Sequence, residues 1–535
     1  MLVYAAVLLV ARCTEGRLLV HAPAGIFRGL PANDGDYDMY LGIPYAKVNA
    51  SNPFGESIPH EKFDNVFDAF TESAVCPQIK EVYKPNSVDI RYEGTLDCLR
   101  LNIFVPKSES KHRAVFIFVF GGRYRNGYNE ISIYGPKYLV RHDIIVVTIN
   151  FRSGPYGFMC MDIPEIPGNQ ALRDQYDAIK WVRDNIEAFG GNPQRLTLCG
   201  HSSGSVLVDM HMLSERPRLF QQAILQSGAA TGPGFFGPSN PMTLVNIARK
   251  LGFKTNDTYS AMSFLAKASP KAIVKATDME YNWKPCVEKK FEEVVPFITV
   301  HPESSEGRNV DGLKILGGFT DRESLFTLNS FQFKPIYNLP NGFQYFLNQH
   351  FNLQNRSDLV DMVHRFYLDD DEDHKSYELK IVDLLSDFHF VYPKQRQMIK
   401  YANHKNTSVY LYMFSYDGDR NLMKKILNIT EARATHADEL GYMFSMGFMP
   451  DTKYKDQCMI DKLTTLWANF VKYGEPTPVT TELLPVRWPP LTGDTVPCLQ
   501  IDSNLTVLSR PFRRRMAFWD LFFDAHLDKL RIPPL

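Results

Sequence analysis

The strongest chemical signal in the 535-residue chain is a serine in a glycine-flanked turn, Gly200-His201-Ser202-Ser203-Gly204. A serine hydroxyl is a weak nucleophile at neutral pH, so it needs a base within reach and a position clear of the backbone. A sharp turn from a strand into a helix gives that position, and small residues let the two elements approach closely. The pattern also arises by chance, and the alternative interpretation is a turn with a buried serine. Here an apolar run precedes the turn and a helical pattern follows it, which favours Ser202 as a nucleophile.

Short apolar runs alternate with stretches of helical period through the middle of the chain. Runs rich in β-branched and aromatic residues are typical of strands buried on both faces of a parallel sheet. Such runs are Ala114–Phe120 and Ile144–Ile149, and the further predicted strands are Arg195–Cys199, Gln222–Gln226, Lys314–Phe319 and Val409–Ser415. Between them, apolar residues recur at helical spacing within 170–189 and 205–213. The alternation predicts an α/β fold, with a large parallel sheet flanked by helices.

The overall composition excludes several classes of protein. Apolar residues make up 44% and charged residues 22%, as in ordinary globular proteins. The 59 basic and 60 acidic residues give a net charge of −1, so nucleic acid is not an expected partner. No apolar run is long enough to predict a membrane span. Histidine, cysteine and carboxylate residues show no metal-ligand spacing, so we expect no metal and no cofactor.

The N-terminus and the glycosylation motifs indicate secretion. Residues 1–16 contain a short apolar stretch followed by small or polar residues, which resembles a signal peptide without the usual positive start. An N-terminal strand or a wrongly assigned start is the alternative. Asn-x-Ser/Thr motifs begin at Asn49, Asn256, Asn355, Asn406, Asn428 and Asn504. Each motif alone is weak evidence, but together with the N-terminus they predict a secreted glycoprotein.

Several longer motifs surround the serine turn in a fixed order. They are Gly42–Ala46, Asp97–Ile103, Asn150–Pro155, Gly168–Gln175 and Phe189–Pro193. Their sequence is similar to that of the type-B carboxylesterase and cholinesterase family of α/β-hydrolases, over roughly residues 20 to 520, and details resemble the insect-type carboxylesterases. The resemblance implies the α/β-hydrolase fold, with a large, mostly parallel central sheet flanked by helices. It implies one catalytic domain over residues 17–535, after the signal peptide at 1–16.

The family resemblance also implies a catalytic triad in the chain order serine, acid, histidine. Glu323 matches the acid in Gly318–Glu323, with Asp321 as a local competitor and Ser324 where the family usually has glycine. His436 matches the base, in a His-x-x-Glu pattern. Glu323 would accept the imidazole N–H and stabilise the imidazolium.

The loop that stabilises the oxyanion departs from the family pattern. By position, its backbone N–H donors would be those of Gly122, Arg123 and Ser203. The loop reads Phe120-Gly121-Gly122-Arg123-Tyr124, where the family has His-Gly-Gly-Gly. Three outcomes are open for Arg123: its side chain points to solvent, it lines the gorge and favours a polar acyl group, or it blocks the oxyanion hole.

The cysteines and tryptophans refine what the resemblance implies. Cys76 and Cys98 match the family's first disulfide, whereas the second disulfide loop has no visible pair because Cys286 stands alone in its region. No tryptophan lies between Cys76 and Cys98 to bind a quaternary ammonium by cation–π attraction, so acetylcholine is a poor candidate substrate. The serine turn also lacks the GQSAG form of juvenile-hormone esterases.

Two functions of different class remain as hypotheses. The first is a secreted serine carboxylesterase that hydrolyses a small-molecule carboxylic ester through an acyl-serine intermediate. The alternative is a catalytically impaired binding or adhesion protein, because the oxyanion loop is altered at Phe120 and Arg123. The oligomeric state and the identity of the ester stay open at this point.

Overall fold

The centre of the molecule is an 11-stranded sheet with the strand order β18-β17-β16-β15-β14-β13-β11-β12-β10-β4-β3. The computed structural model describes residues 18–72, 74–84, 87–278, 281–329, 347–348, 351–353, 356–368 and 374–529. The strands of this sheet are β3 (Leu30–Pro31), β4 (Tyr37–Pro44), β10 (Arg100–Pro106), β11 (Arg113–Val119), β12 (Ile145–Ile149), β13 (Gly191–His201), β14 (Gln222–Gln226), β15 (Lys314–Thr320), β16 (Ser408–Phe414), β17 (Cys498–Ile501) and β18 (Thr506–Leu508).

Parallel pairing runs through the middle of this sheet, and antiparallel pairing is confined to its edges. All neighbouring strands from β12 to β17 pair in parallel. The antiparallel pairs are β12–β10, β10–β4 and β4–β3 at one edge and β17–β18 at the other. Every residue of β11 and β12 is buried, so both faces of the sheet are covered there. The predicted mostly parallel sheet is therefore confirmed.

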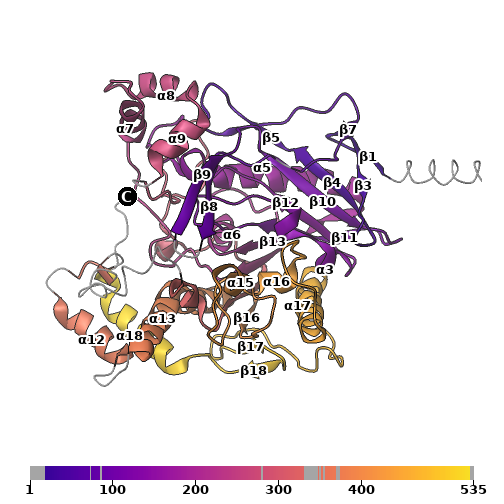
Figure 1. Ribbon diagram of the computed structural model, residues 1–535, viewed down its shortest axis with the longest axis vertical. Coiled ribbons are helices and arrows are strands. Elements are labelled where there is room, and N and C mark those ends of the chain that lie inside the picture. Colours follow the sequence, from indigo (N-terminus) through magenta and orange to yellow (C-terminus); the bar gives the residue numbers. More distant parts are fainter. Residues whose placement is uncertain are drawn as a thin grey trace, which may run out of the picture.

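Helices cover the sheet and extend to both ends of the molecule (Figure 1). The helices are α2 (Ile131–Tyr134), α3 (Lys137–Val140), α4 (Gly154–Phe158), α5 (Gln170–Asn185), α6 (Ser203–Leu213), α7 (Thr243–Lys250), α8 (Thr258–Ala266), α9 (Pro270–Thr277), α12 (Ser357–Tyr367), α13 (His374–Ser386), α14 (Tyr392–Ala402), α15 (Leu422–Leu427), α16 (Leu440–Met443), α17 (Tyr454–Tyr473) and α18 (Arg513–His526). Helices α7 to α9 lie at one end, at the upper left of Figure 1, and α12, α13 and α18 lie at the other, at the lower left. Within the described ranges, no helix combines the length and hydropathy that crossing a bilayer requires.

The predicted elements have the right type, and their boundaries shift by a few residues. The helix expected over 170–189 divides into α5 and a 3-10 turn, η1 (Ile186–Phe189). Strand β13 starts at Gly191, four residues before the predicted start, because Gly191 pairs with Arg113 of β11. Strand β13 then runs directly into the serine turn, and α6 begins at Ser203.

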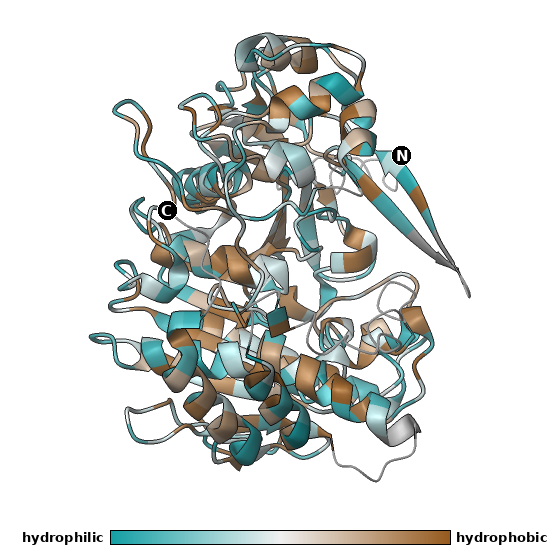
Figure 2. Cartoon of the chain, turned by 90° about the vertical axis from the view of Figure 1, so that its left-hand side faces the viewer, coloured by the Kyte–Doolittle hydropathy of each residue, from teal (hydrophilic) through white to brown (hydrophobic). Residues whose placement is uncertain are grey.

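A β-hairpin stands out from the body of the protein near the loop that contains Gly122 and Arg123. Strands β8 (Gln78–Lys84) and β9 (Ser87–Glu93) pair in antiparallel register between Cys76 and Cys98. Figure 2 shows this hairpin projecting at the right, with hydrophilic and hydrophobic residues alternating along it. Such alternation is expected of a ribbon with one face turned to the protein and the other to solvent.

The remaining short elements lie outside the central sheet. They are the strands β1 (Leu19–Ala22), β2 (Gly25–Arg28), β5 (Ala46–Val48), β6 (Ser57–Pro59) and β7 (Phe67–Asp68), the 3-10 turns η2 (Pro302–Ser304), η3 (Glu323–Thr327) and η5 (Leu527–Lys529), and one π-helical turn, η4 (Asp387–Val391).

Candidate active site

Ser202 occupies the turn between β13 and α6 with a strained backbone. Its φ of 57° and ψ of −128° lie in a region that non-glycine residues rarely adopt. The turn is fixed by a hydrogen bond of 2.8 Å from the Ser202 N–H to the carbonyl of Gln226, at the end of β14. Ser202 is partly exposed, whereas its neighbours His201 and Ser203 are buried. The strain thus presents one hydroxyl at the carboxyl ends of the parallel strands.

The two glycines of the turn are required by close backbone contacts. A Cβ on Gly200 would lie 2.2 Å from the carbonyl oxygen of Gly204. A Cβ on Gly204 would lie 2.3 Å from the carbonyl oxygen of Val119, in β11. Any larger residue would therefore push α6 away from the sheet and displace Ser202.

Glu323 and His436 form a buried hydrogen-bonded pair. Glu323 begins the 3-10 turn η3, directly after β15, and its side chain is fully buried. Nδ1 of His436 lies 2.7 Å from Oε2 of Glu323. The His436 backbone N–H also donates to the Glu323 carbonyl at 3.0 Å, so a second hydrogen bond fixes the position of the two loops relative to each other. With Nδ1 donating to the carboxylate, Nε2 is left to act as a base.

The other carboxylate oxygen is also engaged. Oε1 of Glu323 accepts from the Ser227 hydroxyl at 2.6 Å and from the Thr320 N–H at 2.8 Å. Ser227 follows Gln226, whose carbonyl accepts the Ser202 N–H. The end of β14 therefore ties the turn of Ser202 to the carboxylate of Glu323.

No hydrogen bond joins Ser202 and His436, the remaining pair of the predicted triad, although both lie within the described residues. The ring of His201, the residue before Ser202, lies 4.8 Å from the ring of His436, centroid to centroid. Among the described residues, neither the Ser202 hydroxyl nor Nε2 of His436 has a hydrogen-bond partner. Catalytic hydrogen bonds of this kind are often long in a free enzyme and shorten when substrate binds.

The competing residues of the sequence analysis occupy other positions. Asp321 accepts hydrogen bonds from Arg433 and from the Ala434 N–H, at 3.1 and 3.0 Å, and burial raises its pKa to about 6. Burial, followed by repulsion from His436, holds the pKa of His201 well below its usual value, so its ring is neutral at pH 7. The partner of His436 in the structure is accordingly Glu323.

The predicted oxyanion donors lie beside the serine turn, and one of them is occupied. The Gly122 N–H donates to the Ser203 hydroxyl at 3.0 Å. Arg123 and Tyr124 have left-handed backbones, with φ of 54° and 62°. The Arg123 guanidinium lies 2.6 and 2.7 Å from the two carboxylate oxygens of Glu81 in β8. The side chain of Arg123 thus fastens the loop to the hairpin at the surface.

Two disulfides join cysteines of the described residues, Cys76–Cys98 and Cys160–Cys286. The sequence left the partner of Cys286 open, and the structure pairs it with Cys160. Its partner Cys160 lies 126 residues earlier, after α4, and the local sequence carries no signal of so distant a contact.

A buried lysine that the sequence analysis did not single out lies behind the serine turn. Nζ of Lys394, in α14, donates to the carbonyl of Gly228 and lies 3.5 Å from the hydroxyl of Ser205. Burial lowers the pKa of Lys394 to about 7, against the opposing attraction of Asp209 and Glu323. No motif marks this residue, because its role arises only when α14 packs against α6.

Two further buried carboxylates follow His436. Asp438 accepts from the backbone N–H groups of Thr435, Met423 and Lys424, and burial raises its pKa to about 7. Glu439 accepts from Gln226 at 3.2 Å. Burial and, second, repulsion from Glu323 raise the pKa of Glu439 to about 8.

We expect Glu439→Gln to flatten the pH dependence of stability. Between its ordinary value of 4.5 and about 8, Glu439 keeps a proton in the folded chain that the unfolded chain has lost. Folded protein then binds more protons than unfolded protein, so stability falls with rising pH by up to about 1.4 kcal/mol per unit. Urea unfolding midpoints across this window should fall less steeply in the variant than in the wild type. The exposed Glu482→Gln serves as control, and equal slopes in all three proteins would contradict the expectation.

Among the described residues, no set of side chains forms a metal-binding site. In that part of the chain, no group of three or more histidine, cysteine or carboxylate side chains could hold a metal ion.

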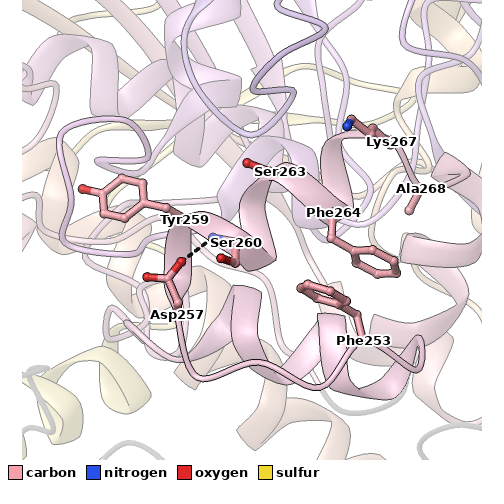
Figure 3. A pocket seen from close by; sticks show the side chains of 8 residues that line it. All are labelled: Phe253, Asp257, Tyr259, Ser260, Ser263, Phe264, Lys267 and Ala268. Atoms are coloured by element: carbon pink, nitrogen blue, oxygen red, sulfur yellow. Dashed lines mark hydrogen bonds between the residues drawn. The ribbon is translucent and has the colours of Figure 1, made fainter.

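A surface hollow formed mainly by α8 lies apart from the candidate active site (Figure 3). Its lining includes the stacked pair Phe253 and Phe264, with ring centroids 4.6 Å apart, and it contains none of the site residues.

The glycosylation motifs lie at the surface where they are described. Asn256, Asn406, Asn428 and Asn504 are exposed and Asn49 is half-buried. Asn355 and residues 1–16 lie outside the described residues.

Comparisons with known proteins agree with the observed fold. A sequence profile described as the carboxylesterase family matches residues 17–519. The chain is 28% identical to juvenile hormone esterase of Heliothis virescens (96% of this chain, 95% of that protein) and 27% identical to acetylcholinesterase of Bungarus fasciatus (96% and 88%). It is 29% identical to esterase FE4 of Myzus persicae (84% and 82%). Its fold is similar to the crystal structure of juvenile hormone esterase from Manduca sexta with OTFP covalently attached (TM-score 0.79, 26% identity, covering 95% and 99%).

Proposed function

The chain belongs to the carboxylesterase family, and we propose that it is a secreted serine esterase that hydrolyses a small carboxylic ester through an acyl-Ser202 intermediate. The observation that carries this proposal is the buried Glu323–His436 pair beside the strained Ser202 turn. Structural carboxylate–histidine pairs occur elsewhere, but a strained serine next to one is the arrangement that nucleophilic catalysis requires.

The proposed reaction has two halves. In the first, Oγ of Ser202 attacks the ester carbonyl while Nε2 of His436 takes the hydroxyl proton and then passes it to the leaving alcohol. In the second, His436 takes a proton from water, the hydroxide attacks the acyl carbon, and the proton returns to Ser202 as the acid departs. Glu323 accepts the Nδ1–H of His436 and stabilises the imidazolium in both halves. The N–H groups of Gly122, Arg123 and Ser203 would receive the oxyanion.

The substrate class is a small-molecule carboxylic ester. The rings of Phe326 and Phe390 lie 5.9 and 4.8 Å from the ring of His436, so apolar surface adjoins the base. One relative, the acetylcholinesterase of Bungarus fasciatus, is named for its substrate acetylcholine. The absence of tryptophan between Cys76 and Cys98 argues against acetylcholine for this chain. A panel of p-nitrophenyl esters with graded acyl length would identify the preferred acyl group.

Secretion is part of the proposal. Two disulfides and exposed glycosylation motifs fit an oxidising extracellular environment. The match to the family begins at residue 17, which supports residues 1–16 as a signal peptide and 17–535 as one catalytic domain.

Covalent labelling tests the proposed nucleophile. We expect diisopropyl fluorophosphate to phosphorylate the purified protein once, at Ser202, because the activated hydroxyl attacks phosphorus as it would a carbonyl. Peptide mass spectrometry locates the modified residue, and Ser202→Ala is the control that should take no label. A folded protein that stays unlabelled, or takes the label elsewhere, contradicts the esterase.

A binding or adhesion protein is the second candidate function. The observation that favours it is the occupied N–H of Gly122, since an oxyanion hole that lacks one of its donors stabilises the transition state less and supports less turnover. Under this alternative the fold would be intact and Ser202 would not react.

A further inference from the structure

The Ser203 side chain occupies part of the oxyanion hole. Ser203 begins α6, and only 4% of the residue is exposed. Its hydroxyl oxygen accepts the Gly122 N–H at 3.0 Å. The backbone N–H of Ser203 is itself an expected donor to the oxyanion. One residue therefore supplies one donor of the hole through its backbone and engages another through its side chain.

The loop of Gly122 is fastened on several sides, so its N–H cannot turn freely toward a substrate. The Gly122 carbonyl accepts from the N–H groups of Arg125 and Asn126, at 3.0 and 3.3 Å. A Cβ on Gly122 would lie 1.9 Å from the carbonyl oxygen of Asn126, which shows how tightly the loop closes. The Tyr124 carbonyl accepts from the Gly154 N–H at 2.7 Å, and Glu81 holds the Arg123 guanidinium. The part that can move is the Ser203 hydroxyl, by rotation about one bond.

We propose that the Ser203 hydroxyl is a competitor for the oxyanion hole, which a substrate oxygen must displace from the Gly122 N–H before that donor can stabilise the transition state. The proposal rests on the proposed esterase function. A neutral carbonyl oxygen is no better an acceptor than a hydroxyl, whereas a developing oxyanion is a much stronger one. Displacement therefore accompanies charge development, and its cost falls on kcat rather than on KM.

Removing the hydroxyl while keeping the backbone gives a direct test. Ser203→Ala retains the N–H of residue 203 and frees the N–H of Gly122. We expect kcat for p-nitrophenyl acetate to rise about tenfold with KM unchanged, and phosphorylation of Ser202 to accelerate by a similar factor. The gain cannot exceed the roughly 10²–10³-fold that one oxyanion donor contributes.

Two further substitutions at position 203 test whether the loss of the hydroxyl, and not another change at that position, causes the rise in kcat. Ser203→Gly also lacks the hydroxyl and should show the same rise, and Ser203→Cys carries a weaker acceptor and should fall between. Ser263→Ala, an exposed serine on α8, is the matched control. Circular dichroism and melting temperature verify that each variant is folded.

The outcomes separate this inference from the proposed function. If the wild type is phosphorylated at Ser202 but neither Ser203→Ala nor Ser203→Gly reacts faster, the competitor role is wrong and the esterase stands. If the wild type stays unlabelled and the variants react, the wild type is not an active esterase, and the competitor role is supported because the Ser203 hydroxyl is what blocks the site. If no folded protein reacts, both the esterase and the competitor role are overturned.

Discussion

We expect His436→Ala to lower kcat for p-nitrophenyl acetate by about 10⁶-fold and Glu323→Gln by about 10⁴-fold. Loss of the base leaves the Ser202 hydroxyl protonated, and the effect of removing a triad histidine in comparable enzymes is of this size. Loss of the acid leaves the base in place but without the group that fixes its tautomer, which costs less. Steady-state kinetics on purified variants would measure both effects.

The geometry of Glu323 explains why a neutral isostere should fail there. Its carboxylate receives the His436 Nδ1–H at 2.7 Å, the Ser227 hydroxyl at 2.6 Å and the Thr320 N–H at 2.8 Å. An amide has one accepting oxygen, so its NH₂ group would face one of these donors. The imidazole would then lose its accepting partner at Nδ1 and the charge that stabilises its protonated form.

Asp321→Asn is the matched control for Glu323→Gln. Asp321 lies two residues earlier and is also buried, but its contacts are Arg433 and the Ala434 N–H. We expect its removal to change kcat by less than about tenfold. A loss as large as that of Glu323→Gln would mean that the acid of the triad has been assigned to the wrong residue.

The sequence predicted the elements that carry the site because each has a local signature. A continuous apolar run indicates a buried parallel strand, and the glycines around Ser202 mark the turn that follows it. The acid and the base were predicted differently, through similarity to a family, since nothing in their spacing requires Glu323 and His436 to meet. The structure brings these two together by a hydrogen bond between the turn η3, which follows β15, and the loop before α16.

What the sequence did not predict depends on contacts between distant segments. Lys394 reaches Gly228 only because α14 packs beside α6, and Cys160 reaches Cys286 across 126 residues. The hydrogen bond from the Gly122 N–H to the Ser203 hydroxyl also joins segments that lie far apart in the sequence. Arg123 was the visible departure in the oxyanion loop, yet its guanidinium binds Glu81, whereas the side chain that takes up the Gly122 N–H is that of Ser203.

A buried ion pair in the motifs that resemble the family should be essential for stability. Arg152 and Asp174 are both fully buried. Nε and Nη2 of Arg152 each lie 2.7 Å from an oxygen of Asp174, and Nη1 donates to the carbonyls of Pro53 and Gly55, at 2.9 and 2.8 Å. The pair joins the loop after β12 to helix α5 and to the chain at 53–55.

We expect Asp174→Asn to lower the free energy of unfolding by about 3–5 kcal/mol, because it leaves the guanidinium of Arg152 buried without a counter-charge. Asp184→Asn, in the exposed pair of Lys180 and Asp184 on the same helix, should cost less than about 1 kcal/mol. Urea unfolding midpoints followed by tryptophan fluorescence measure both variants against the wild type. A loss for Asp174→Asn no larger than that of the surface control would show that water reaches Arg152.

The same variant distinguishes a structural role from a catalytic one. Asp174 contacts none of Ser202, Glu323 or His436 in the described structure, so the molecules that remain folded should keep the wild-type KM and react with diisopropyl fluorophosphate at the wild-type rate. His436→Ala should show the reverse, with a near-normal unfolding midpoint and an unreactive Ser202. A change in KM or in labelling rate of folded Asp174→Asn would instead mean that α5 positions the serine turn. The motif containing Asp174 would then act on catalysis through the contact of α5 with β13 as well as on stability.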